Sequence, residues 1–161
     1  MSEEVVEALN KQLNQELRNA YLYFAMAAYF KSLALNGFAH FLMVQAREEV
    51  EHALKIYEYI TRRGWSVKLY EVVPEKTTWT SVEEAVKDFY EAEKRNTQRI
   101  WELVELARKH GDKATEAFLQ WFVNEQVEEE ELATDLRTKV ELVKGNIAAL
   151  LALDNILAQR K

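Results

Sequence analysis

Glycine and proline are scarce in this chain, and the few that occur separate long segments of helical periodicity. Among 161 residues there are four glycines and one proline. A glycine just past the last turn is a common helix stop, so Gly37, Gly64, Gly111 and Gly145 predict where helices end. We expect five helices, at about residues 3–33, 38–63, 81–109, 113–143 and 146–159. The sequence therefore predicts an all-α protein.

Apolar side chains recur every three or four residues in these segments, and this spacing supports the prediction of helices. Leu9 and Leu13 begin such a stripe in the first segment, and the same spacing continues in the other long segments. Ser81 and Glu84 form the pattern of a capping box at the start of the third helix.

The lengths of the connections indicate how the helices are arranged. The short links after Gly37 and Gly111 make the first and second helices, and the third and fourth, antiparallel neighbours. Residues 65–80 form a much longer link. An extended chain covers up to about 3.3 Å per residue, so this link can run along a helix of about 40 Å. We expect one long crossover, with the second and third helices parallel.

These elements predict a single domain over residues 1–161. Its four-helix bundle would span about 3–143, with one long crossover and a short fifth helix at about 146–159. The chain is long enough for one domain with a substantial core.

Composition narrows the possible partners and location. The net charge of −6 argues against nucleic acid as a partner, and no stretch of about 18 apolar residues could span a membrane. Cysteine is absent, which excludes disulfides and fits a reducing compartment. The first residues, Met1-Ser2-Glu3-Glu4, do not resemble a secretory leader. We expect a cytoplasmic protein with neither membrane nor nucleic-acid partners.

Ionisable side chains interrupt the apolar stripes near the midpoints of four helices. They are Glu16, Glu49 with His52, Glu93 and Glu129. Because each lies about midway along its helix, the carboxylates come level whichever way the helices run. A carboxylate in a bundle core is costly unless positive charge lies beside it. Four helices that each contribute one therefore predict a pair of metal ions.

The spacing Glu49-x-x-His52 places both side chains on one face of a helix. Both can bind one ion, while Glu49 keeps an oxygen for a second. Carboxylate oxygens combined with an imidazole suit iron or manganese better than copper or structural zinc.

Several blocks of sequence resemble the non-haem ferritins of bacteria and archaea. The blocks are Leu9-Asn10-x-Gln12-Leu13-Asn14-x-Glu16-Leu17, Tyr21-Leu22-Tyr23, Glu48-Glu49-x-x-His52-Ala53, Glu93 with Thr97-Gln98, and Phe118-Leu119-Gln120-Trp121-Phe122-Val123-x-Glu125-Gln126-Val127-Glu128-Glu129-Glu130. The resemblance covers essentially the whole chain, and the last block is very specific. It implies a ferritin-like fold.

The resemblance also implies roles for individual residues. Glu16, Glu49 and His52 would hold a first iron, and Glu49 would bridge to a second iron held by Glu93 and Glu129. The carboxylates expected at a third iron site are Glu48, Glu125, Glu128 and Glu129.

Two further residues receive roles from the resemblance. Gln126 would border the centre, and Tyr23 would be the nearby tyrosine that acts in electron transfer. The block Lys94-Arg95-Asn96, beside the expected ligand Glu93, is more polar than the family pattern.

The function implied by the resemblance is iron storage with ferroxidase activity. Such a protein oxidises Fe²⁺ with O₂ and keeps Fe³⁺ as a mineral inside a hollow homo-oligomer. The family's shell has twenty-four subunits, and Ile147 to Leu157 would form the fifth helix at a symmetry axis. Haem is not expected, because Val50 stands where bacterioferritins carry a haem-ligating methionine. Their second Glu-x-x-His pair is here Gln126-x-x-Glu129.

Other interpretations use the same residues. A di-iron oxidase or peroxidase that detoxifies without storing would share the ligands in a small oligomer, and a structural bundle or engineered cage subunit would bind no iron. The fifth helix and the third-site carboxylates favour storage, and the retention of every expected ligand argues against a bundle without iron. Glu48 and Glu128 could instead face solvent. Tyr23 could instead be a core aromatic residue with a hydrogen-bonded hydroxyl.

Overall fold

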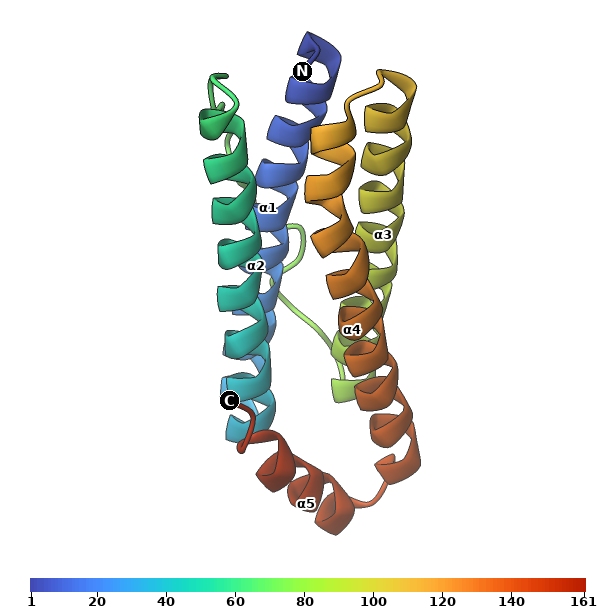
Figure 1. Cartoon of the computed structure of the whole chain (residues 1–161). Coiled ribbons are helices and arrows are strands. Elements are labelled where there is room, and N and C mark those ends of the chain that lie inside the picture. The colour runs from blue at the N-terminus through green and yellow to red at the C-terminus, as the bar shows by residue number, and fades with distance from the viewer.

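Five helices and one long connection make up the computed structural model, which describes residues 1–161 (Figure 1). The helices are α1 (Glu3–Ser32), α2 (Asn36–Arg62), α3 (Val82–Lys109), α4 (Lys113–Val143) and α5 (Ile147–Leu157). The predicted all-α bundle with one crossover and a short fifth helix is confirmed.

Side-chain oxygens determine where most of the helices begin. Ser2, Ser81, Asp112 and Asn146 each accept a hydrogen bond from a backbone N–H in the first turn that follows. The Ser81 hydroxyl accepts from the Glu84 N–H at 3.0 Å, as its sequence pattern predicts. These caps satisfy N–H groups that have no partner within the helix.

The glycines end helices at three of the four predicted positions. Gly64, Gly111 and Gly145 have positive φ angles of 79°, 65° and 77°. The prediction for Gly37 is wrong, because α1 ends at Ser32 and Ala34 takes the positive φ angle instead. Gly37 lies within the first turn of α2, where a Cβ would stand 1.7 Å from the carbonyl oxygen of Asp154. Close packing of α5, rather than helix termination, requires glycine there.

Two buried asparagines on α1 hold the crossover in place. Asn10 donates to the Ser66 carbonyl at 3.2 Å and accepts from the Lys68 N–H at 2.7 Å. One turn later, Asn14 donates to the Lys68 carbonyl and accepts from the Tyr70 N–H, both at 2.8 Å. The connection therefore runs along the bundle, as its length predicts, and α2 and α3 are parallel (Figure 1).

The bundle core consists of two apolar clusters with a polar layer between them. One cluster includes Phe30 and Phe89, and the other includes Leu9 and Ile56. The polar layer comprises the buried side chains of Gln12, Glu16, Gln45, Glu49, His52, Glu93, Asn96, Gln126 and Glu129. The two clusters thus enclose a set of polar groups at mid-depth.

Helix α5 packs across one end of the bundle (Figure 1). Leu153 and Leu157 join the first apolar cluster, and the Asp154 carboxylate accepts a hydrogen bond from the Phe38 N–H at 2.8 Å. These contacts fix α5 against the start of α2. No helix combines the length and apolar character needed to cross a membrane.

Candidate metal centre

Each of the four long helices brings one carboxylate to the polar layer. Glu16 comes from α1, Glu49 and His52 from α2, Glu93 from α3 and Glu129 from α4. All five side chains are at most 3% exposed. They are buried because each continues an apolar stripe at the middle of its helix.

Ligand atoms of these five side chains and of Glu125 gather into three groups, in each of which all atoms lie within 4.8 Å of one another. The groups are Glu16, Glu49 and His52; Glu49, Glu93 and Glu129; and His52, Glu125 and Glu129. Glu49 belongs to the first two groups, which is the arrangement that a bridging carboxylate requires. The structure thus brings together all five predicted ligands of the first two ions.

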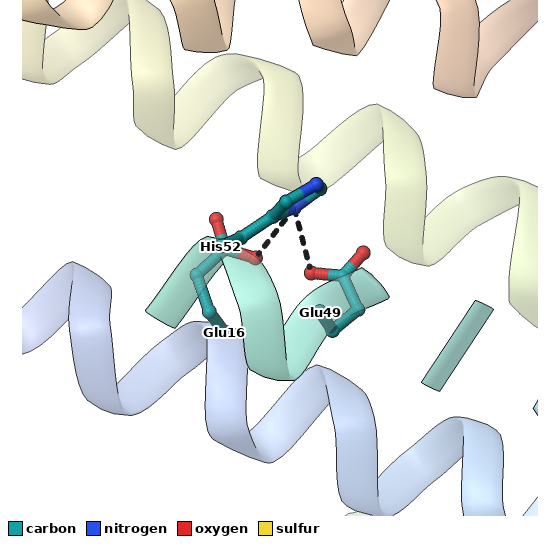
Figure 2. A group of neighbouring side chains, drawn as sticks. All are labelled: Glu16, Glu49 and His52. Atoms are coloured by element: carbon teal, nitrogen blue, oxygen red, sulfur yellow. Dashed lines mark ion pairs between the residues drawn. The ribbon is translucent and has the colours of Figure 1, made fainter. Parts of the chain in front are cut away.

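The first half of the centre, Glu16, Glu49 and His52, contains buried polar atoms without hydrogen-bond partners. The His52 Nδ1 atom lies 3.5 Å from a Glu49 oxygen and 3.8 Å from a Glu16 oxygen (Figure 2). That nitrogen, both Glu49 oxygens and one Glu16 oxygen are buried without a hydrogen-bond partner. Such groups cost about 1–3 kcal/mol each when unsatisfied. A cation among them would satisfy all four atoms.

The second half of the centre, Glu93 and Glu129, receives several hydrogen bonds. Tyr23 donates its hydroxyl to Glu93 at 2.6 Å, and Gln126 donates to the other oxygen of Glu93 at 3.3 Å. Gln45 donates to Glu129 and, at 3.4 Å, to Glu93. The predicted neighbours Tyr23 and Gln126 therefore both contact the second half, through Glu93.

Side-chain amides connect the two halves. Gln12 donates to Glu16 and to the Asn96 carbonyl, both at 3.0 Å. Asn96 in turn donates to Glu16 at 3.3 Å and to the Gln126 carbonyl at 3.2 Å. The amide nitrogen of Gln126 also donates to the Glu93 backbone carbonyl at 3.2 Å and to the Thr97 hydroxyl at 3.0 Å. This network fixes the orientation of each amide.

Sequence reasoning missed three members of the polar layer. Gln45 lies four residues before Glu49, Gln12 lies four before Glu16, and Asn96 lies three after Glu93. The signal was therefore present: each is a polar residue on the same stripe as a ligand. Within the polar block beside Glu93, only Asn96 belongs to the polar layer, because it is buried while Lys94 and Arg95 are exposed.

Burial and mutual repulsion make full ionisation of the carboxylates costly without added positive charge. Burial raises the pKa of Glu49 well above its usual range, and the charges of Glu16 and Glu93 raise it further. Burial and the charge of Glu93 raise the pKa of Glu129 to about 10. Burial also raises the pKa of Glu93, although the Tyr23 hydroxyl opposes that effect. A divalent cation would displace these protons.

One ion pair already exists in the first half. Burial alone would raise the pKa of Glu16, but the neighbouring Glu49 and His52, together with Gln12, lower it to about 2. Burial would lower the pKa of His52, yet the Glu16 carboxylate raises it overall. A bound metal would compete with this proton, since imidazole binds metal in its neutral form.

The expected third-site residues are only partly brought together. Glu125 is half-buried and shares a group with His52 and Glu129. Glu128 is exposed and belongs to none of the three groups, and neither does Glu48. The Glu48 carboxylate instead pairs with Arg160 at 3.3 Å.

A surface cavity between α2 and α4 leads to His52. Its volume is about 370 Å³, and Glu51, Glu58 and Trp121 are among its lining residues. Lys55 lies above the Trp121 ring, with its Nζ 3.7 Å from the ring centroid. Two carboxylates and one ammonium group therefore line the surface beside His52.

Comparison with known proteins relates this arrangement to one family. The model of the Ferritin-like domain matches residues 6–143. A bacterial non-heme ferritin from Staphylococcus epidermidis is 46% identical over 130 residues, which are 81% of this chain and 78% of the relative. The matched family region contains every carboxylate of the polar layer.

Solved structures extend the similarity to the whole chain. An open-pore ferritin from the archaeon Archaeoglobus fulgidus superposes with a TM-score of 0.98 at 46% identity, covering 100% of this chain and 99% of the other. A form of that ferritin engineered to be closed has a TM-score of 0.98 at 47% identity, covering 100% and 98%. Helix α5, outside the family-model match, is included in these superpositions.

Proposed function

The chain belongs to the Ferritin-like domain family, and on that premise we propose that it is an iron-storage ferritin that oxidises Fe²⁺ with O₂. One observation carries the proposal: four buried carboxylates from four helices gather with His52 in one polar layer, and Glu49 is shared by two of the groups. The partnerless buried oxygens support binding of cations there.

In the proposed reaction the chain binds two Fe²⁺ ions as substrate. Glu16, Glu49 and His52 hold one ion, and Glu49, Glu93 and Glu129 hold the other. Carboxylate charge stabilises Fe³⁺ more than Fe²⁺, so these ligands favour loss of an electron from each ion. Over two turnovers, four Fe²⁺ and one O₂ with six waters give four FeO(OH) and eight protons.

The polar layer contributes protons and orientation to this chemistry. Displacement of protons from Glu49 and Glu129 would accompany ion binding, because both have raised pKa values. Tyr23 and Gln126 hold Glu93 from opposite sides. We assign them positioning roles, and we include electron transfer by Tyr23 in the proposal.

Storage requires an enclosed volume, so the proposal includes a hollow homo-oligomer of twenty-four subunits in the cytoplasm. Large apolar side chains on the surface support assembly. Ile147 and Ile156 on α5 are 76% and 60% exposed, and Leu69 on the crossover is 67% exposed. The similar structures are those of an open-pore ferritin and of an engineered closed form of it.

We propose that Glu125, together with Glu129 and His52, receives iron as it leaves the two-ion centre. Its place in a group with these residues supports this role. Glu48 and Glu128 lie outside that group, so the proposal gives them only an outer, minor part in the third site. The whole chain is taken as one domain.

Aerobic addition of Fe²⁺ to the purified protein tests the function. Ferric oxide absorbance and particle mass are followed as iron is added in increasing ratio to the 18.9 kDa subunit. Many irons retained per subunit in a large particle support storage. Catalytic oxidation by a small oligomer that retains no iron supports detoxification instead, and absence of catalysed oxidation overturns both.

A further inference from the structure

Gln45 occupies a position between the second half of the centre and an arginine from the far end of the chain. It is fully buried on α2, one turn before Glu49. Its amide nitrogen donates to Glu129 and Glu93, and its carbonyl oxygen accepts from Arg160 at 2.9 Å. The amide therefore links Arg160 to two expected metal ligands.

Arg160 determines which way this amide points. A guanidinium only donates hydrogen bonds, so the group that faces it must be an acceptor. The carbonyl of Gln45 accordingly turns toward Arg160, and the NH₂ group turns toward the carboxylates. Rotation of the amide by 180° would place its oxygen against the Glu129 and Glu93 carboxylates, and its NH₂ group against the Arg160 guanidinium. Only one orientation satisfies both sides.

The position of the guanidinium is itself well determined. It donates to the Phe41 carbonyl at 2.9 Å, lies 4.3 Å from the centroid of the Phe41 ring, and pairs with Glu48 at 3.3 Å. The Arg160 carbonyl contacts the His40 ring nitrogen at 2.6 Å. The side chain is 15% exposed. Four contacts besides the one with Gln45 therefore hold an arginine that lies outside the four-helix bundle.

Packing of α5 brings Arg160 to this place. The close approach of Asp154 to Gly37 and its hydrogen bond to Phe38 fix α5 against α2, and Leu157 anchors its last turn. The chain then continues for three residues to Arg160 alongside α2. The contact with Gln45 thus depends on how α5 is seated.

We propose that Arg160 is a positioning residue for the second half of the centre and acts through Gln45. By fixing the amide, it holds Glu129 and Glu93 in the orientation that binds the second ion, and so links the seating of α5 to that ion. The inference rests on the proposed function, because it presupposes a two-ion site. It predicts an effect on one ion only, since the side-chain hydrogen bonds of Gln45 reach Glu129 and Glu93 and none reaches Glu16, Glu49 or His52.

The test is an anaerobic Co²⁺ titration of the full chain, followed by calorimetry and by visible absorption of the bound metal. Loss of an outer partner of a metal ligand costs about 10- to 100-fold in affinity. In Arg160→Met the second Co²⁺ should therefore bind about 10-fold more weakly, with the first unchanged. Arg160→Lys keeps the charge and a donor, and should recover part of the loss.

Arg63→Met provides the matched control. Arg63 also lies over an aromatic ring and pairs with a carboxylate, its contacts being Tyr59 and Asp112, but it caps the far end of α2. This variant should bind both Co²⁺ ions as the parent does. An equal effect in Arg63→Met and Arg160→Met would overturn the inference, because it would indicate general loosening.

Gln45→Met closes a double-mutant cycle. If Arg160 acts through Gln45, this substitution alone should weaken binding of the second Co²⁺, and adding Arg160→Met should weaken that binding little further. Additive losses, equal losses for both ions, or unchanged binding in Arg160→Met would each overturn the inference. Gln45→Met also keeps the test decisive if Arg160→Met changes the helix content or the assembly.

The same titration separates failure of the inference from failure of the proposed function. A parent protein that binds two Co²⁺ per subunit, with Arg160→Met unchanged, overturns the role of Arg160 alone. A parent that binds none overturns the two-ion centre and, with it, the role of Arg160.

Discussion

Glutamates supply most of the ligands in both halves of the centre, but the two halves are stabilised differently. In the first half, both Glu49 oxygens and the His52 Nδ1 atom are buried without partners. In the second half, Tyr23 and Gln126 donate to Glu93, and Gln45 donates to both carboxylates. In the first half protein donors therefore reach only one oxygen of Glu16, and a cation would satisfy the remaining atoms, whereas in the second half protein donors reach both carboxylates.

This difference predicts an order of binding. A cation entering the first half satisfies unpaired atoms and displaces no side-chain hydrogen bond from Glu49. A cation in the second half must share Glu93 and Glu129 with their donors. We expect the first ion to bind more tightly, and the second to be the more sensitive to changes around it.

The largest effect is expected where the halves meet. Glu49→Ala removes a ligand from both ions at once, so the initial rate of Fe²⁺ oxidation should fall by more than about 100-fold, the upper range for lost outer partners. Stopped-flow absorbance measures this rate. Glu51→Ala, an exposed neighbour on α2, is the control and should be close to the parent. Unchanged kinetics in Glu49→Ala would refute the bridging role.

Glu129→Gln should raise the folding stability of the metal-free protein while it weakens binding of the second ion. The folded protein keeps a proton on Glu129, with its pKa of about 10, that the unfolded chain releases above its ordinary value of 4.5. Rising pH in this range therefore favours unfolding. The glutamine variant avoids this loss, so it should be more stable by about 1–3 kcal/mol at pH 7.

The pH dependence identifies the cause of that stabilisation. Urea unfolding of the chelator-treated proteins should show the advantage of Glu129→Gln shrinking toward pH 4.5 and growing up to pH 10. An advantage independent of pH would mean that packing, and not the proton on Glu129, is responsible. Glu128→Gln, one residue away and exposed, should show no such trend.

Tyr23→Phe tests the donors of the second half. The substitution removes the hydroxyl that donates to Glu93 at 2.6 Å and leaves the ring packed against Phe89. The second Co²⁺ should bind about 10-fold more weakly, and calorimetry should show the first unchanged. Tyr21→Phe is the control, because Tyr21 is 46% exposed. Equal weakening of both ions would contradict the division into halves.

The smallest effects are expected outside both halves. Glu125→Gln should leave the first turnover intact and slow later turnovers a few-fold, because Glu125 groups with His52 and Glu129. Glu128→Gln, outside all three groups, should change either phase by less than about twofold. Multiple-turnover oxidation measured at increasing iron ratios distinguishes them. A larger effect for Glu128→Gln would assign iron transfer to the exposed residue.

Helical phase made much of the centre predictable from sequence. Glu16, Glu49, His52, Glu93 and Glu129 interrupt apolar stripes, and all five are buried at one depth. Phase is a local property, since residues three and four apart share a face of any helix. The same spacing also marks Gln12, Gln45 and Asn96, but neutral amides cost less to bury than carboxylates and so give a weaker sequence signal.

Gly37 shows where local reasoning failed. A glycine between helical segments has the form of a helix stop, yet this one lies in α2 because Asp154 of α5 packs against it. That requirement comes from a residue more than a hundred positions away, and no nearby pattern encodes it.

The sequence by itself therefore determined the helices, their antiparallel pairs and crossover, and the depth of the ligands, because periodicity, caps and connection lengths act over short distances along the chain. Tertiary structure alone decided which donor reaches which carboxylate. The contact of Gln45 with Glu129 joins residues 84 apart, and that with Arg160 joins residues 115 apart. Such contacts depend on how the helices are rotated and how α5 is seated, and packing of the whole core fixes both.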